Sequence, residues 1–211
     1  MDLVGPHDVR IAGELAAETL KPLAETADWS VPAGELDWTC RRTLDHICDC
    51  LLYYSGQLAR RADRQGPVIR DGHAEATIAS LVAVVRSTAA VLAAVAEGTP
   101  PDVRAYHPAG MADRSGYCAM GIDETLIHTH DIACGLGVPF TPPPDLCAAV
   151  VQRLFPWAPA VDDPWSMLLW ANGRTALSGH DRLDARWGWF CEPLADWDGT
   201  MSRRQRPPRW T

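Results

Sequence analysis

Apolar residues recur every three or four positions along the first two thirds of the chain, which is the spacing of amphipathic helices. The pattern predicts long helices over about 8–27, from Asp37 or Thr39 to about 63, over about 74–97 and over about 116–136. Pro22 is expected to kink the first helix or to end it late. Four long helices with antiparallel-sized connections predict an all-α four-helix bundle.

The pattern changes after residue 140. It predicts three shorter elements, which are a helix after the prolines at 142–144 to about 155, a helix over 165–174 and a strand over 183–191 with Trp187 and Trp189 on one side. The arginine-rich end, residues 201–211, is expected to be solvated and is assigned no function. We therefore divide the chain into a helical bundle, 1–140, and a C-terminal extension packed on it, 141–211.

Composition and charge exclude several classes of protein. The net charge of -8 over 211 residues argues against a surface for nucleic acid or for an anionic membrane. The longest weakly polar stretch, 81–96, contains Arg86 and is too short to span a bilayer, and no signal-peptide pattern opens the chain. Seven cysteines, an odd number, fit reduced thiols better than a disulfide framework, so we expect a cytoplasmic protein without nucleic-acid or membrane partners.

Three residues suggest a metal site. Glu124 and His128 are four apart, so they project from one face of the predicted fourth helix, and His46 lies in the second helix. Two imidazoles and a carboxylate are the ligand set of an open catalytic zinc site. The alternatives are a surface pair in the fourth helix and a hydrogen-bonded core histidine in the second. The apolar surroundings of Glu124 and His128 favour burial, and a buried carboxylate needs a partner.

Two aspartates stand three residues after the predicted histidine ligands. Asp49 follows His46, and Asp131 follows His128. Each could hold the free ring nitrogen of its histidine and raise the basicity of the ligand. The alternatives are a solvated face for Asp49 and a helix-end charge for Asp131.

The segments DWTCRRTLDHI and ETLIHTHDIACGLG resemble the DinB-like superfamily, and within it the mycothiol-dependent maleylpyruvate isomerase group. The resemblance covers about 8–140, and the segment LLWANGR, which ends at Arg174, is a looser match. The matching positions are Trp38, Thr39, His46, Glu124, His128 and Asp131. The resemblance implies a four-helix bundle whose three ligands hold zinc or a similar divalent ion, with a low-molecular-weight thiol, mycothiol or bacillithiol, as cosubstrate. The segment after 140 does not match the second domain of the isomerase.

These expectations lead to a metal-dependent enzyme that activates a mycothiol-like thiol to isomerise or S-conjugate a small electrophilic substrate. The same ligand set could hold hydroxide and hydrolyse a small molecule. A non-catalytic, metal-stabilised bundle and a metal-independent small-molecule pocket remain as other classes. The residue types do not choose between zinc, nickel, iron and manganese.

The second substrate is expected to lie between the loop 98–115 and the aromatic C-terminal segment. The candidate contact residues are Asp49, Tyr53, His107, Arg114 and Trp187. Asp131 and Arg174 are the candidate catalytic residues, because Arg174 could clamp a carboxylate. A structural bond to a helix end is the alternative for Arg174. A dimer is compatible with the sequence.

Overall fold

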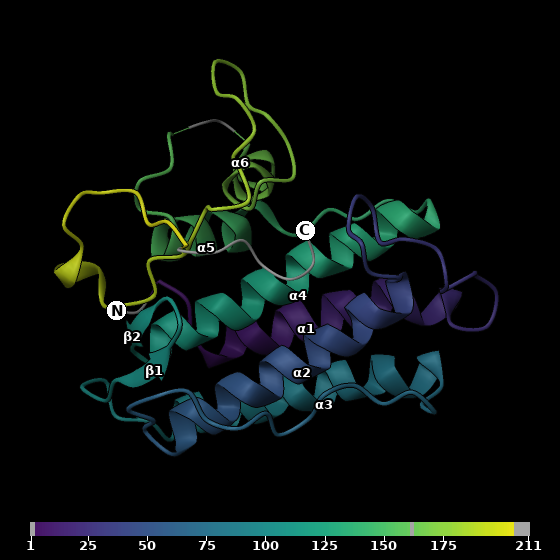
Figure 1. Ribbon diagram of the computed structural model, residues 1–211, viewed down its shortest axis with the longest axis horizontal. Helices are drawn as coiled ribbons and strands as arrows, with labels where there is room; N and C mark the ends of the chain where they lie inside the picture. Colours follow the sequence, from purple (N-terminus) through teal and green to yellow (C-terminus); the bar gives the residue numbers. More distant parts are fainter. Residues whose placement is uncertain (1–2, 161–162, 205–211) are drawn as a thin grey trace.

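The computed structural model describes residues 3–160 and 163–204, and within them the chain is mostly helical (Figure 1). The α-helices are α1 Pro6–Leu20, α2 Cys40–Ala59, α3 Ile78–Glu97, α4 Arg114–Leu136, α5 Pro144–Leu154 and α6 Pro164–Ala171. Two short strands, β1 Ala105–His107 and β2 Gly110–Ala112, form an antiparallel hairpin between α3 and α4. Short 3₁₀ turns occupy Lys21–Leu23 and Leu194–Asp196.

The helix ends follow from local chemistry. The side chains of Thr39, Thr77 and Asp113 each accept a backbone N–H from the first turn of α2, α3 and α4 respectively. Helix α1 ends earlier than the sequence predicts, because Pro22 has no N–H for a further helical bond and the chain tightens into a 3₁₀ turn. Gly137 ends α4 in the left-handed conformation, with φ of 68°.

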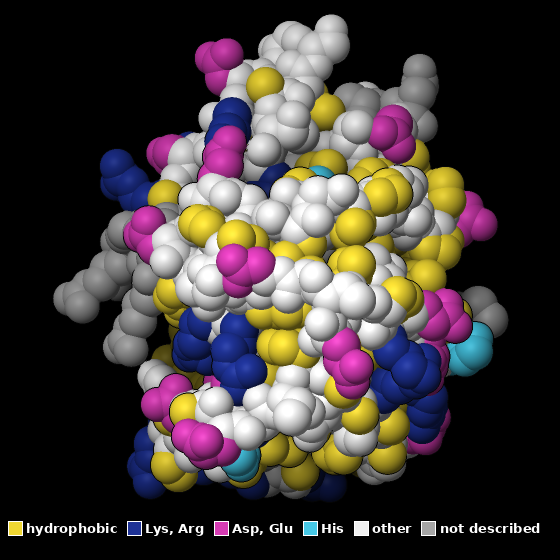
Figure 2. Space-filling model, turned by 90° about the vertical axis from the view of Figure 1, so that its right-hand side faces the viewer, with side chains coloured by type: hydrophobic (Ala, Val, Ile, Leu, Met, Phe, Trp, Pro, Cys, Tyr) yellow, Lys and Arg dark blue, Asp and Glu magenta, His cyan; other side chains and the backbone are white. Residues whose placement is uncertain are grey.

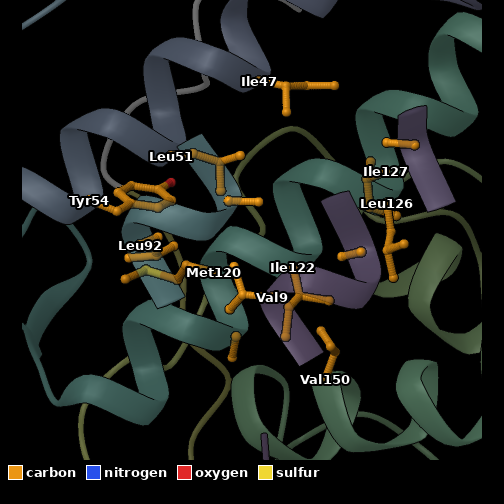
Figure 3. Close-up of a cluster of buried hydrophobic side chains, with 14 of the residues drawn as sticks. Val9, Ile47, Leu51, Tyr54, Leu92, Met120, Ile122, Leu126, Ile127 and Val150 are labelled. Carbon is orange, nitrogen blue, oxygen red and sulfur yellow. The ribbon is translucent and has the colours of Figure 1, made fainter. Parts of the chain in front are cut away.

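The four long helices lie side by side (Figure 1). Helix α1 packs against α3 and α4, and α2 packs against the same two helices. Helices α5 and α6 lie on the side of α4 that faces away from α2 and α3, so most of α4 is buried. Figure 3 shows buried side chains that meet in one core, among them Val9 of α1, Leu51 of α2, Leu92 of α3, Met120 of α4 and Val150 of α5.

The N-terminal end of α2 approaches the C-terminal end of α4 very closely at Gly135. A Cβ atom there would lie 2.3 Å from the carbonyl oxygen of Pro32 and 2.7 Å from Sγ of Cys40. Such separations are far inside van der Waals contact, so only glycine fits without moving the backbone of the segment before α2. This contact helps to fix the position of α2 relative to α4.

Two expectations about irregular segments were wrong. Residues 183–191 form no strand; Trp187 makes an isolated bridge with Arg203, and its ring packs 6.0 Å from that of Trp189. Both rings are buried, although the segment is irregular, because they complete the core under the C-terminal extension. The loop expected over 98–115 instead contains the β1–β2 hairpin.

The C-terminal end is less solvated than the sequence suggested. Residues 205–211 lie outside the described part of the chain. The guanidinium of Arg204, however, stacks 4.3 Å from the ring centroid of Trp187 and 5.1 Å from that of Trp189.

Helix α3 is long and apolar enough to cross a membrane by length and composition, which corrects the expectation that this stretch is too short. Its apolar face packs against α1 and α2, and Arg86 on α3 forms an ion pair of 2.7 Å with Glu14 on α1. These contacts are those of a helix packed in the core of a helical protein. On the face drawn in Figure 2, acidic and basic side chains are interspersed with apolar ones.

The C-terminal extension is tied to α4 through a buried carboxylate. Asp123 accepts a hydrogen bond of 2.8 Å from the side-chain amide of Asn172 and one of 2.9 Å from the indole N–H of Trp189. Both donors belong to the segment after α5. Burial raises the pKa of Asp123 to about 7, although these two hydrogen bonds act in the opposite direction.

Replacing Asp123 by asparagine is expected to destabilise the protein by roughly 1–3 kcal/mol, because an amide would direct N–H groups at one of the two donors. Urea denaturation followed by circular dichroism measures the change. Asp28→Asn, at an exposed aspartate that only caps a local turn, is the matched control and is expected to change stability by less than about 0.5 kcal/mol. Equal stability of the Asp123→Asn variant and the unaltered protein would contradict a stabilising role for the hydrogen bonds that Asp123 accepts from Asn172 and Trp189.

Candidate metal centre

A buried carboxylate, Glu124, stands at the centre of the candidate site. Its side chain is 5% exposed. One oxygen, Oε1, accepts a hydrogen bond of 3.1 Å from the hydroxyl of Tyr54 on α2. The other, Oε2, lies 3.0 Å from Nε2 of His128 and 3.8 Å from Nε2 of His46. The structure therefore brings the three predicted ligands together around one oxygen atom.

The packing of two helices produces this meeting. Glu124 and His128 lie one turn apart on α4, and His46 projects from α2. The rings of His46 and His128 lie edge to face with their centroids 5.2 Å apart. Trp38, just before α2, also contacts the ring of His46, at 4.8 Å between ring centroids. The ring of His46 thus contacts both Trp38 and His128.

A fourth potential donor, Cys50, was missed as a site residue. Its Sγ lies 3.2 Å from Nε2 of His46, one turn earlier on α2. One donor atom each from His46, Cys50 and Glu124 lie within 4.8 Å of one another. The signal that could have identified Cys50 in the sequence is its spacing of four residues from His46.

The donor atoms suit a small divalent ion. Typical zinc bond lengths of about 2.0–2.3 Å give donor separations of about 3.3–3.8 Å in a tetrahedron. The observed separations around His46 and Glu124 are 3.0, 3.2 and 3.8 Å. Imidazole nitrogen, thiol sulfur and carboxylate oxygen are all zinc donors. The short distance of His128 is to Oε2 of Glu124, whereas the short distance of Cys50 is to Nε2 of His46.

A second layer of residues holds His128 in place. Nδ1 of His128 lies 3.0 Å from Oδ2 of Asp131, as the three-residue spacing predicts. Arg174 donates from Nε and Nη2 to the two oxygens of Asp131, at 2.9 and 2.7 Å. A third bond from Arg174 goes to the Asn172 carbonyl. The guanidinium that was expected to clamp a substrate carboxylate thus binds the carboxylate of Asp131 in the structure.

Burial and charge set the protonation of the centre. Burial alone would raise the pKa of Glu124, but the hydrogen bond and charge of His128 outweigh it and lower the pKa to about 2. Burial would lower the pKa of His128, but Asp131 and Glu124 raise it to about 9. Burial lowers the pKa of His46 to about 4. At neutral pH in the metal-free protein, His46 is neutral and His128 carries a proton between two carboxylates.

Two predicted contact residues lie elsewhere. Asp49 does not bind the ring of His46; its carboxylate accepts from Arg70, Arg42 and the backbone N–H of Gly72. The pair with Arg70 fastens the connection between α2 and α3 onto α2, which the local sequence could not indicate. Arg114 is ten residues from Glu124, or about 15 Å along the helix axis, and donates to the Thr99 carbonyl.

Other predicted residues lie beside the centre. His107, at the end of β1, is buried, and its ring lies 5.5 Å from that of Tyr54, the residue that binds Glu124. Burial lowers the pKa of His107 to about 3, so its ring is neutral. The hydroxyl of Tyr53 is buried without a hydrogen-bond partner in the described structure. Arg204, which was assigned no function, contributes positive charge near Glu124.

A cavity of about 580 Å³ adjoins the second layer. Asp131, Arg174 and Trp187 are part of its lining. Trp187, which was predicted to contact substrate, therefore lies at this cavity, and Asp131 belongs both to the cavity wall and to the hydrogen-bonded cluster around His128.

Comparison with known proteins gives a match to a family model. The family model for the mycothiol maleylpyruvate isomerase N-terminal domain matches residues 9–133, which include His46, Glu124 and His128 as well as Asp131. The match ends just before the predicted boundary at 140. No curated protein and no solved structure gives a significant match to the chain.

If the cluster binds a divalent ion, Asp131→Asn is expected to weaken binding about 10–100-fold, because His128 loses the anionic partner that makes its ring a better donor. Isothermal titration with Zn²⁺ measures the change. Arg182→Gln is the control, since Arg182 lines the same cavity but pairs with the exposed Glu35. Equal affinities for the Asp131→Asn and control variants would show that this second layer does not act on the ion.

Metal affinity is also expected to rise with pH. The pKa of His128 is raised to about 9, so its imidazolium must lose a proton before the ring can act as a ligand at any lower pH. The apparent association constant should therefore increase at least about tenfold per unit between about pH 6 and pH 8. Competition with a chromophoric chelator measures it. A flat profile over this range would contradict the protonated state.

Proposed function

Because the chain belongs to the mycothiol maleylpyruvate isomerase N-terminal domain family, we propose that it is a divalent-metal-dependent enzyme acting with a low-molecular-weight thiol of the mycothiol type. The reaction is isomerisation or S-conjugation of a small electrophilic substrate. The fold that we propose for the matched region is the DinB-like four-helix bundle formed by α1–α4, with a cytoplasmic location and zinc as the first candidate ion. The convergence of His46, Glu124 and His128 carries the proposal.

Each of the three residues would supply one ligand atom to the ion. His46 offers Nε2 from α2, while Glu124 and His128 offer Oε2 and Nε2 from α4. A divalent ion bound there supplies the Lewis acidity that lets a thiol lose its proton at neutral pH. Tyr54 fixes the other oxygen of Glu124, so that Oε2 faces the two histidines.

The surrounding residues keep this arrangement rigid and dry. Asp131 and Arg174 fix the ring of His128. The rings of Tyr54, His107 and Trp189 form a buried wall beside Glu124, with 5.7 Å between the last two. Exclusion of water strengthens the electrostatic interactions within the site. We propose that the electrophile binds against this wall, where Tyr53 adds a hydroxyl.

S-conjugation and isomerisation begin with the same step. The thiol gives up its proton to solvent, and its sulfur forms a bond to an electrophilic carbon of the substrate. Protonation of the resulting adduct gives a stable S-conjugate. Rotation about a carbon–carbon bond of the adduct, followed by cleavage of the carbon–sulfur bond, gives an isomer and returns the thiol.

One observation favours a second function, a metal-stabilised bundle without chemistry. Structural zinc sites have four protein ligands, whereas catalytic sites keep one position open. Cys50 offers a fourth protein donor beside His46. Whether the site accepts an external thiol therefore decides between the two functions.

The test is ligand substitution with a matched control. His46→Ala, Glu124→Ala and His128→Ala are each expected to reduce bound metal from about one ion per chain to less than a tenth of that and to abolish thiol-dependent turnover. His130→Ala is the control, since His130 is also on α4 but stacks on Trp165. Elemental analysis measures the metal, and an assay with maleylpyruvate-like electrophiles and a thiol measures turnover.

The outcomes separate the classes. Loss of metal and turnover with an unchanged circular dichroism spectrum supports the enzyme. Unfolding of all three variants, together with no thiol binding to the unaltered protein, supports the structural function. Turnover of an ester or amide without a thiol would indicate a hydrolase, and a chain that binds no divalent ion would exclude the metal-dependent functions.

A further inference from the structure

We infer that Cys50 is a fourth protein ligand, and that its sulfur occupies the position that an external thiol takes in the reaction proposed above. The second half of this inference rests on the proposed function. The first half rests only on the side chains of α2 and α4. The thiol of Cys50 would then compete with the cosubstrate thiol for the same position on the ion.

The geometry around His46 carries the inference. Sγ of Cys50 lies 3.2 Å from Nε2 of His46 and 3.7 Å from its Nδ1, so the sulfur is in contact with the ring on the side of its two nitrogen atoms. Nε2 of His46 is 3.8 Å from Oε2 of Glu124. Cys50, His46 and Glu124 are the group of potential ligand atoms that lies within 4.8 Å in the described residues. Sulfur, nitrogen and oxygen therefore surround one small volume.

The position of Cys50 along α2 allows this arrangement without a change in the backbone. It stands one helical turn after His46, so both side chains leave the same face, and no movement of the backbone is needed to bring them together. Coordination releases the thiol proton to solvent and leaves a thiolate, the form in which cysteine binds zinc. The resulting set of two imidazoles, one carboxylate and one thiolate has four donors, which is the preferred number for zinc.

A second cysteine of the chain provides an internal comparison. Cys134 also stands four residues after a histidine, and its Sγ lies 3.5 Å from Nε2 of His130. Cys134 is exposed, however, and it is not part of the group formed with Glu124. Spacing alone is therefore shared by the two cysteines, and only Cys50 faces the buried carboxylate.

The experiment uses the full chain loaded with Co²⁺ in the absence of any thiol, compared with Cys50→Ala, Cys50→Ser and Cys134→Ala. A cobalt–thiolate bond gives an intense charge-transfer absorption in the near ultraviolet. The absorption is expected in the unaltered protein and in Cys134→Ala, and its loss is expected in both Cys50 variants. We also expect Co²⁺ affinity to fall at least about tenfold in the Cys50 variants. Circular dichroism checks that all four proteins are folded.

Addition of 2-mercaptoethanol then tests the shared position. In Cys50→Ala the absorption should appear as the added thiol binds. In the unaltered protein its intensity should stay constant, because one thiolate replaces another. A doubled intensity in the unaltered protein, or no absorption in the Cys50→Ala variant, would overturn the shared position.

The failures of the two proposals are distinguishable. An unaltered protein that binds one Co²⁺ without the charge-transfer absorption overturns the role of Cys50 and leaves the proposed function standing. Equal charge-transfer absorption in the Cys50 variants and in the unaltered protein also overturns the role of Cys50 and leaves the proposed function standing. An unaltered protein that binds no Co²⁺ overturns both.

Discussion

The candidate site depends on one constraint, the burial of the Glu124 carboxylate between two helices. A carboxylate removed from water needs compensating charge and hydrogen bonds. Here the compensation runs along a line of alternating charge, from Glu124 to the imidazolium of His128, then to Asp131 and Arg174. Loss of one member would leave its neighbours uncompensated in a buried environment. The line therefore requires both α4 and the segment after α6 to keep their positions.

The fold supplies that rigidity from both sides of α4. On one side α2 contributes His46 and Tyr54, and its N-terminal end is placed against α4 at Gly135. On the other side α5, α6 and the irregular segment after them cover α4, with Asp123 as a buried anchor. The C-terminal extension thus contributes to the site through Arg174 although the family match ends before it.

Local patterns in the sequence predicted most of the helices and the placement of Glu124 and His128 on one face of α4, because both are encoded at short range. Thr39 caps α2 as its position suggested, and the Glu124–His128 spacing places both side chains on one face. Features that depend on distant partners were not predictable in this way. Arg70 reaches Asp49 from a connecting segment, and Arg174 reaches Asp131 from the segment after α6.

The aromatic residues near the C-terminal end also show that a local pattern does not identify distant partners. The alternation of Trp187 and Trp189 suggested a strand, yet no neighbouring strand exists in the described residues for the segment to pair with. Burial of two large rings was enough to fix the segment without a sheet. A pattern of alternating apolar residues reports burial, and the partner decides whether a ladder forms.

The raised pKa of His128 places a positive charge beside the buried carboxylate of Glu124. The two N–H groups of this imidazolium lie against Glu124 on one side and Asp131 on the other. One side chain of the chain itself thus compensates two buried carboxylates. A cation that bound Nε2 of His128 would displace the proton there, so its entry would exchange one positive charge beside Glu124 for another.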